Sequence, residues 1–156
     1  MLNSNNLSPK LSPAVLKRLA VIFLILGSLG FLDALYLSVS YISGVPPSCF
    51  ITSSCDVVTT SEYAAIWGIP VAMLGVFYYF TVSLLALLTL DTKNEKFLSG
   101  LSWFTLLGFL ASLWFVYVQF FILKALCIYC LLSALISTLL FILGVYVIYL
   151  FRRKVA

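Results

Sequence analysis

The chain has 156 residues, of which 63% are hydrophobic and only 9% are charged. Soluble domains average about 45–50% apolar and about 25% charged residues, so this composition excludes an ordinary soluble domain and favours a membrane protein. The sequence contains no histidine, which removes the commonest general base and metal ligand, and its net charge of +4 reflects membrane topology rather than nucleic-acid binding.

The first apolar run extends from about residue 19 to 41 and follows a polar, proline-containing start. It is longer than the roughly 7–15 apolar residues of a signal peptide, so we expect a retained transmembrane helix rather than a cleaved leader. Its single acid is Asp33. Charge inside a membrane span is costly and often functional, which leaves two interpretations of Asp33, a proton relay or a neutral packing residue.

Residues 43–68 are expected to form a loop outside the membrane, because Gly44 and two following prolines end the first helix. The loop contains the first cysteine pair, Cys49 and Cys55, which are separated by five residues. A disulfide between these two would close a small ring. The chain has four cysteines, which allow several pairings, and the spacing alone leaves them open.

Further along this loop, Thr59 and Glu62 have the spacing of a capping box. The spacing predicts a short helix that starts there and carries Tyr63, Ile66 and Trp67. Aromatic side chains favour the membrane–water interface, so we expect this interfacial helix to lie across the outer end of the bundle as a lid.

Two further apolar stretches follow the loop, one over residues 69–90 and one over residues 97–151, whose only charge is Lys124. The second stretch has 55 residues, far beyond the ~20 that one span requires, so it is expected to fold back on itself at Lys124. Small residues in membrane helices allow close packing, which we expect at Gly27, Gly30, Gly100 and Gly108.

The second cysteine pair, Cys127 and Cys130, opens the last span as a CxxC motif. Cysteines at i and i+3 share one helix face, and the helix dipole together with Lys124 favours a thiolate at this end. We expect Cys127 nearer to water and Cys130 one turn deeper, within reach of a lipid-soluble oxidant. Thiol–disulfide exchange would then feed the shallower sulfur.

The basic residues orient these spans. In a four-span arrangement Lys124 falls alone on one side, and the other side holds Lys10, Lys17, Arg18, Lys93, Lys96, Arg152, Arg153 and Lys154. Positive loops stay cytoplasmic, so we expect both termini in the cytoplasm and all four cysteines on the outer, oxidising face of the inner (plasma) membrane. The predicted fold is all-α, a single integral membrane domain over residues 1–156, formed as a polytopic four-helix bundle with spans at about 19–41, 69–90, 97–123 and 125–151.

Two cysteine pairs at one membrane face favour a thiol–disulfide relay. Two other interpretations remain open, namely a non-enzymatic membrane module whose cysteines form structural disulfides, and a zinc site made of four thiolates. The C-x5-C spacing is unusual for zinc, and a hydrophobic helix end is a poor setting for a structural metal. We therefore expect no metal, and a thiol–disulfide relay implies no flavin.

The cysteine motifs and their neighbours resemble the bacterial vitamin K epoxide reductase family. The resemblance covers the four spans and rests on Cys55-Asp56-Val57-Val58, Ser61-Glu62-Tyr63-Ala64, Gly68-Ile69-Pro70-Val71-Ala72 with Leu74-Gly75, and Cys127-Ile128-Tyr129-Cys130. Another family of four-helix thiol oxidases carries its CxxC in the first outer loop, whereas here it opens the last helix. The chain departs from eukaryotic members near Ala64 and after the CxxC motif, which favours quinone over epoxide as the substrate.

The resemblance implies a bundle that encloses a quinone, of menaquinone or ubiquinone type, beside the CxxC motif. It implies a membrane thiol:quinone oxidoreductase that re-oxidises a thioredoxin-like partner, here expected to be a separate periplasmic protein because no such domain is fused. One of Cys49 and Cys55 would exchange with the partner and the other would reduce Cys127, while Cys130 faces the quinone. Ser61 matches a position linked to a hydrogen bond with a quinone oxygen, and a helix-capping role is its alternative.

Overall fold

The computed structural model describes residues 12–45, 47 and 55–155. Its four long helices are α1 (Pro13–Ser43), α3 (Val71–Thr92), α4 (Glu95–Tyr117) and α5 (Ile128–Val155). The π-helical turn η2 (Val118–Leu123) continues α4, and each of the four resulting helices is long and apolar enough to cross a membrane. This confirms the predicted all-α bundle of four membrane helices.

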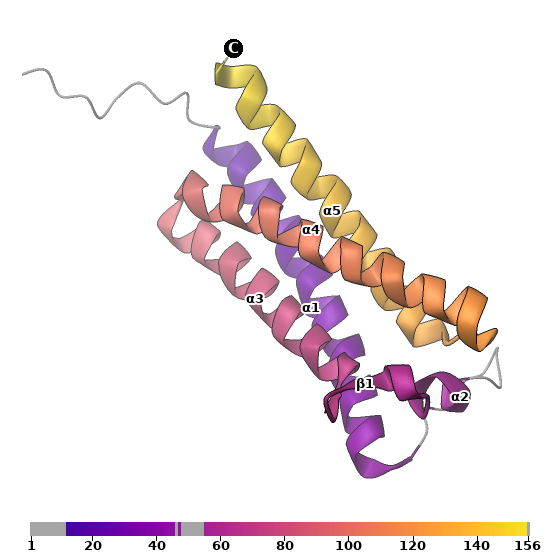
Figure 1. The fold of residues 1–156 in the computed structure, drawn as a ribbon. Coiled ribbons are helices and arrows are strands. Elements are labelled where there is room, and N and C mark those ends of the chain that lie inside the picture. The colour runs from indigo at the N-terminus through magenta and orange to yellow at the C-terminus, as the bar shows by residue number, and fades with distance from the viewer. Residues whose placement is uncertain (1–11, 46, 48–54, 156) are drawn as a thin grey trace, which may run out of the picture.

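The helices run in alternating directions, so their connections gather at two opposite ends of the bundle (Figure 1). The start of α1, the turn between α3 and α4 and the end of α5 lie at one end, which holds Lys17, Lys93 and Arg152. The loop after α1 and the turn between α4 and α5, with Lys124, lie at the other end. These described residues thus separate along the bundle as the sequence predicts.

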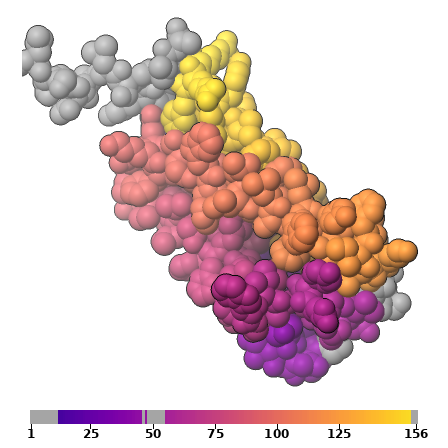
Figure 2. All heavy atoms as spheres, viewed as in Figure 1, coloured from indigo at the N-terminus to yellow at the C-terminus, as the bar shows by residue number. Residues whose placement is uncertain are grey.

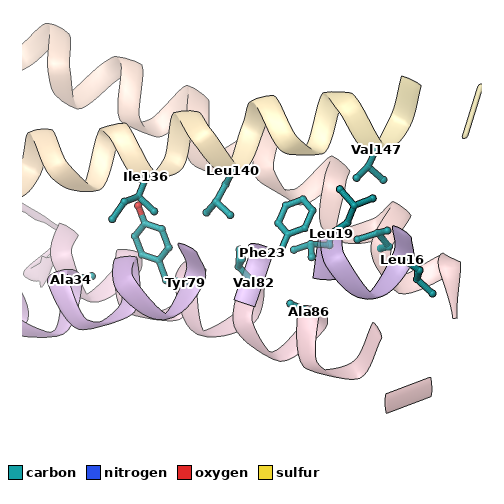
Figure 3. Close-up of a cluster of buried hydrophobic side chains, with 12 residues drawn as sticks. Leu16, Leu19, Phe23, Ala34, Tyr79, Val82, Ala86, Ile136, Leu140 and Val147 are labelled. Atoms are coloured by element: carbon teal, nitrogen blue, oxygen red, sulfur yellow. The ribbon is translucent and has the colours of Figure 1, made fainter. Parts of the chain in front are cut away.

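A core of buried apolar side chains runs along the centre of the bundle (Figure 3). Phe23 of α1, Tyr79 of α3 and Leu140 of α5 are among its most enclosed members. Tyr79 reaches from α3 to α5, where its hydroxyl donates a hydrogen bond to the Ser133 carbonyl oxygen at 2.8 Å. A polar link of this kind fixes the two helices relative to each other in a setting without water.

Two of the glycines predicted to allow close packing lie against tyrosine rings. A methyl group added at Gly30 would overlap the ring of Tyr79, and one added at Gly108 would overlap the ring of Tyr78. The prediction for Gly100 is wrong, because a side chain there would meet nothing within 4 Å.

The loop after α1 folds differently from the prediction. A helix does form, but α2 (Cys55–Thr59) ends where the predicted helix would begin. The Thr59 hydroxyl donates to the Cys55 carbonyl oxygen at 2.9 Å, so it closes α2 instead of capping a following helix. The 3₁₀ turn η1 (Glu62–Ala64) comes next and leads into a hairpin.

The hairpin pairs β1 (Ala65–Ile66) with β2 (Ile69–Pro70) in antiparallel fashion. Its turn residues, Trp67 and Gly68, have φ angles of 52° and 80°. Two successive positive φ angles are typical of a type I′ turn, whose twist matches that of paired antiparallel strands. A hairpin, and not the predicted helix, therefore carries Ile66 and Trp67.

Local backbone signals, and not the edges of the apolar runs, set the ends of the helices. α1 begins at Pro13, upstream of the predicted span, because Ser12 accepts a hydrogen bond from the Val15 N–H and proline suits a first helical position. α5 begins at Ile128, later than predicted, because Lys124 adopts a left-handed conformation and reverses the chain. The reversal itself lies where the sequence placed it.

Candidate redox site

The outer loop and the entry to the last helix bring two cysteines into one buried cluster. Cys55, the first residue of α2, is 1% exposed, and Cys127, just before α5, is fully buried. Both pack together with Val58 and Ala125. Cys55 is disulfide-bonded, whereas Cys127 is a free thiol. The other loop cysteine, Cys49, lies outside the described residues.

The turn before α5 holds Cys127 in place. The Cys127 N–H donates to Oε1 of the buried Gln119 side chain at 3.0 Å. The Cys127 carbonyl oxygen accepts from the Leu131 N–H at 3.0 Å, which starts the hydrogen bonding of α5. The Gln119 carbonyl oxygen also accepts from the Ala125 N–H at 3.2 Å. The wide turn η2 thus lets one residue bind the chain at two points just ahead of the CxxC motif.

Cys127 and Cys130 are both free thiols, three residues apart. A hydrogen bond from the Cys130 side chain lowers the pKa of Cys127 from 9.0 to about 7, although burial acts in the opposite direction. Backbone N–H groups of Cys130 and Tyr129 add to this lowering of the pKa, as expected at a helix N-terminus. The sequence predicted a thiolate from the helix end and from Lys124, and only the first of these contributes.

Beside the CxxC motif lies an apolar cavity of about 560 Å³. All four long helices line it, and the loop contributes Ser61 and neighbouring residues to its wall. Figure 2 shows this part of the loop packed over the outer end of the bundle, against the ends of α1 and α4. Cys130 lies on the cavity wall, whereas Cys55 and Cys127 do not. The volume falls within the range of about 300–1,000 Å³ that is usual for small-molecule sites.

Two buried hydroxyls on the cavity wall, those of Tyr78 and Ser137, make no hydrogen bond of acceptable geometry within the described part of the chain. The two hydroxyls lie close enough to interact with each other. Leaving such groups unpaired is costly, so they mark a place where a ligand with polar atoms would fit. Ser61 differs, because its hydroxyl donates to the Val58 carbonyl oxygen at 2.8 Å and caps no backbone N–H.

Sequence reasoning did not find Tyr78 or Ser137. Tyr78 is one of nine tyrosines and precedes Tyr79, whose hydroxyl is bonded to α5. Ser137 lies in an apolar helix in which Ser133 looks equally suitable. No local pattern in the sequence separates the residues that face the cavity from their neighbours.

Asp33 lies on α1 at the level of the CxxC motif. Its carboxyl group interacts electrostatically with Cys127, Cys130 and Tyr79. The Oδ2 atom is buried and has no hydrogen-bond partner among the residues that the structure describes. This carboxyl group thus acts on both thiols through its charge and does not line the cavity.

The zinc interpretation requires several thiolates around one ion. Over residues 12–45 and 55–155 no three cysteine, aspartate or glutamate side chains gather closely enough to hold a metal ion. Cys49, which would be one of the four ligands, lies outside these ranges.

Comparison with protein families gives a match that spans most of the chain. The model of the vitamin K epoxide reductase family matches residues 21–145, a range that runs from the first span into the last and includes both cysteine pairs. A search of curated proteins found no match. The chain therefore belongs to the vitamin K epoxide reductase family, a family of membrane thiol/quinone oxidoreductases.

Proposed function

We propose that this protein re-oxidises a separate thioredoxin-like protein and passes the electrons to a quinone through its loop cysteines and its CxxC motif. One observation carries the proposal, namely the placement of the described sulfur atoms. Cys55 and Cys127 share a buried cluster although they are far apart in the sequence, and Cys130 lines an apolar cavity. This is the order of contacts that a relay from the loop to a lipid-soluble acceptor requires.

The relay begins when a dithiol of the partner reduces the loop disulfide. Two electrons and two protons pass to Cys49 and Cys55, and the partner leaves as its own disulfide. Because Cys55 is buried beside Cys127, we assign the inward transfer to Cys55 and the exchange with the partner to Cys49.

The Cys55 thiolate then attacks the Cys127 sulfur of a Cys127–Cys130 disulfide, and Cys130 is released as a thiolate. Cys49 resolves the resulting mixed disulfide by attacking Cys55, which reforms the loop disulfide and leaves Cys127 reduced. The CxxC pair now holds the two electrons, with one of its sulfurs on the cavity wall.

The cavity fits the expected acceptor. A bound quinone would supply a two-electron, two-proton sink, and the Cys127–Cys130 disulfide reforms as the electrons leave. The apolar wall suits a ring and an isoprenoid tail, and the unpartnered hydroxyls of Tyr78 and Ser137 would donate to the ring oxygens. Ser61 would join them once its hydroxyl turns from the Val58 carbonyl oxygen.

The proposal places the relay on the outer side of the plasma membrane. Basic residues at the opposite end of the bundle favour cytoplasmic termini, and the loop then faces the oxidising periplasm. A partner that forms disulfides in secreted proteins works in that compartment. Labelling of a cysteine-free variant that carries Trp67→Cys, at a loop position that is 99% exposed, with a reagent that cannot cross the membrane tests this orientation.

The experiment that tests the function combines purified protein, a short-chain quinone and either a reduced thioredoxin-like protein or a small dithiol, and follows quinone absorbance. Cys127→Ala and Cys130→Ala should abolish the reaction with both reductants. Cys49→Ala and Cys55→Ala should retain it with the small dithiol, which reduces the CxxC pair directly, and lose it with the protein. Full activity of either CxxC variant would reject the proposal.

The alternative is a non-enzymatic membrane module, and the disulfide at Cys55 is the observation that favours it. A structural disulfide stays closed during turnover, whereas a relay disulfide opens and reforms. Free thiols counted before reduction, after reduction and after addition of quinone separate the two functions. A count that returns to its starting value only when quinone is added supports the relay.

A further inference from the structure

We propose that Gln119 is a positioning residue that sets the reduction potential of the Cys127–Cys130 pair. The inference rests on the proposed function, in which this pair carries the electrons. Gln119 is 2% exposed, and it lines the same cavity as Cys130. It therefore lies between the redox motif and the space for the electron acceptor.

The contact between Gln119 and the motif is a hydrogen bond to the main chain. Oε1 of Gln119 accepts the Cys127 N–H at 3.0 Å, and both residues are buried. This N–H lies just before Ile128, the first residue of α5, where the N–H groups of a helix have no partner within the helix. Gln119 thus supplies an acceptor that α5 itself cannot provide.

The π-helical turn η2 places Gln119 for this contact. The N–H groups of Lys124 and Ala125 both reach the Gln119 carbonyl oxygen, so the chain folds back over the main chain of this one residue. π-Helical turns are rare in proteins, and those that occur are often found at functional sites. Because the main chain of Gln119 holds the turn and its side chain holds Cys127, replacing the side chain removes the second contact and leaves the first.

The hydrogen bond should favour the disulfide over the dithiol. A Cys127–Cys130 disulfide requires both sulfur atoms at bonding distance, a constraint that the dithiol does not have. By restricting the Cys127 main chain, Gln119 reduces the conformational entropy lost when the disulfide closes. Loss of one buried hydrogen bond typically shifts an equilibrium by roughly tenfold, and here the shift should be toward the dithiol.

Two variants and one control test the inference. Gln119→Met keeps the length of the side chain without a strong acceptor, and Gln119→Asn keeps the amide but is too short to reach Cys127. Thr105→Val is the matched control, because it removes a different buried polar group, a hydroxyl on α4 that donates to the Ser102 carbonyl oxygen in the same helix.

The full-length protein is equilibrated with graded ratios of reduced to oxidised dithiothreitol, without quinone or partner. Two electrons and two protons pass from the dithiol to the Cys127–Cys130 disulfide, and thiol labelling with mass spectrometry gives the reduced fraction. Both Gln119 variants should reach half-reduction at a roughly tenfold lower ratio than wild type, and Thr105→Val should match wild type. Hydrogen exchange at the Cys127 amide should be faster in both Gln119 variants.

Wild-type equilibria in the Gln119 variants would overturn the inference, as would an equal shift in Thr105→Val, which would indicate a general loss of packing. If Gln119→Met does not fold, Gln119→Asn decides, since it keeps the polarity of the site. Failure of the proposed function would look different, because wild-type protein would then fail to reduce quinone whatever the potential of its CxxC pair.

Discussion

Replacing Cys130 with alanine should restore ordinary acidity to the Cys127 thiol. The hydrogen bond from Cys130 is the largest cause of the low pKa of Cys127, and without it burial opposes only the backbone N–H groups. The pKa should therefore rise from about 7 back toward 9.0. A thiol with the lower pKa is about half ionised at pH 7 and one with the higher pKa about 1% ionised, so the thiolate fraction should fall roughly 50-fold.

The assay uses protein in which Cys49 and Cys55 are serine, so that the CxxC cysteines are the only thiols. Ultraviolet absorbance of the thiolate reports ionisation without requiring a reagent to reach the buried sulfur. The parent protein should titrate near pH 7 and Cys130→Ala near pH 9, while Cys130→Ser, which keeps a hydroxyl donor, should stay near the parent. A Cys130→Ala protein that still titrates near pH 7 would refute this reasoning and assign the effect to the helix end alone.

Three further predictions follow from the same geometry. A depressed thiol pKa stabilises the reduced folded protein above that pKa and not below it. As the pH rises, the CxxC reduction potential should therefore fall by about 59 mV per pH unit below pH 7 and by about 30 mV per pH unit between pH 7 and 9. Redox titration would show one slope throughout this range if Cys127 were ordinary. Gly108→Val should push the Tyr78 ring into the cavity and raise the KM for quinone several-fold while leaving the dithiol equilibrium unchanged, and an unaltered KM would argue against the cavity as the quinone site. If the Asp33 carboxyl group accepts a proton released by the thiols, Asp33→Asn should lower kcat with a small dithiol by roughly tenfold or more. A wild-type kcat together with lower thermal stability would instead identify Asp33 as a packing residue.

The four helices could be predicted because a membrane leaves the backbone few alternatives. Without water each N–H and C=O group must bond within its own segment, so a sufficiently long apolar run becomes a helix. The reversal at Lys124 follows in the same way, since the apolar stretch around it is too long to cross once. Outside the lipid, capping residues set the helix ends. This is why α1 begins at Pro13, after the N-cap Ser12 and before the apolar run starts.

The loop and much of the site depend on contacts that no local pattern records. Trp67 has no preference for the positive φ angle that a type I′ turn requires, so Gly68 was the only signal of the hairpin. Tyr78 and Ser137 lie on different helices and meet only when α3 packs near α5. The turn that brings Gln119 to Cys127 is π-helical, and the apolar sequence around it contains no pattern that predicts this conformation.

The point of attack on the CxxC disulfide depends on a competition between acidity and proximity. Because the pKa of Cys127, at about 7, lies below that of an ordinary thiol, Cys127 is a good leaving group, and acidity favours attack on Cys130. Proximity favours attack on Cys127, which is enclosed in the cluster of Cys55, while Cys130 lies at its edge and opens onto the cavity. Well-oriented neighbours gain effective concentrations of about 10⁵ M or more, so proximity should decide.

This competition can be read directly from a trapped intermediate. In Cys49→Ala protein the mixed disulfide formed by Cys55 cannot be resolved from the loop, so it should accumulate after reduction of Cys55 and oxidation of the CxxC pair. Peptide mapping should find Cys55 joined to Cys127 and Cys130 as a free thiol. A Cys55–Cys130 linkage would show that acidity prevails, and electrons would then enter at the sulfur beside the cavity, which removes the reason for two successive sulfurs in the last helix.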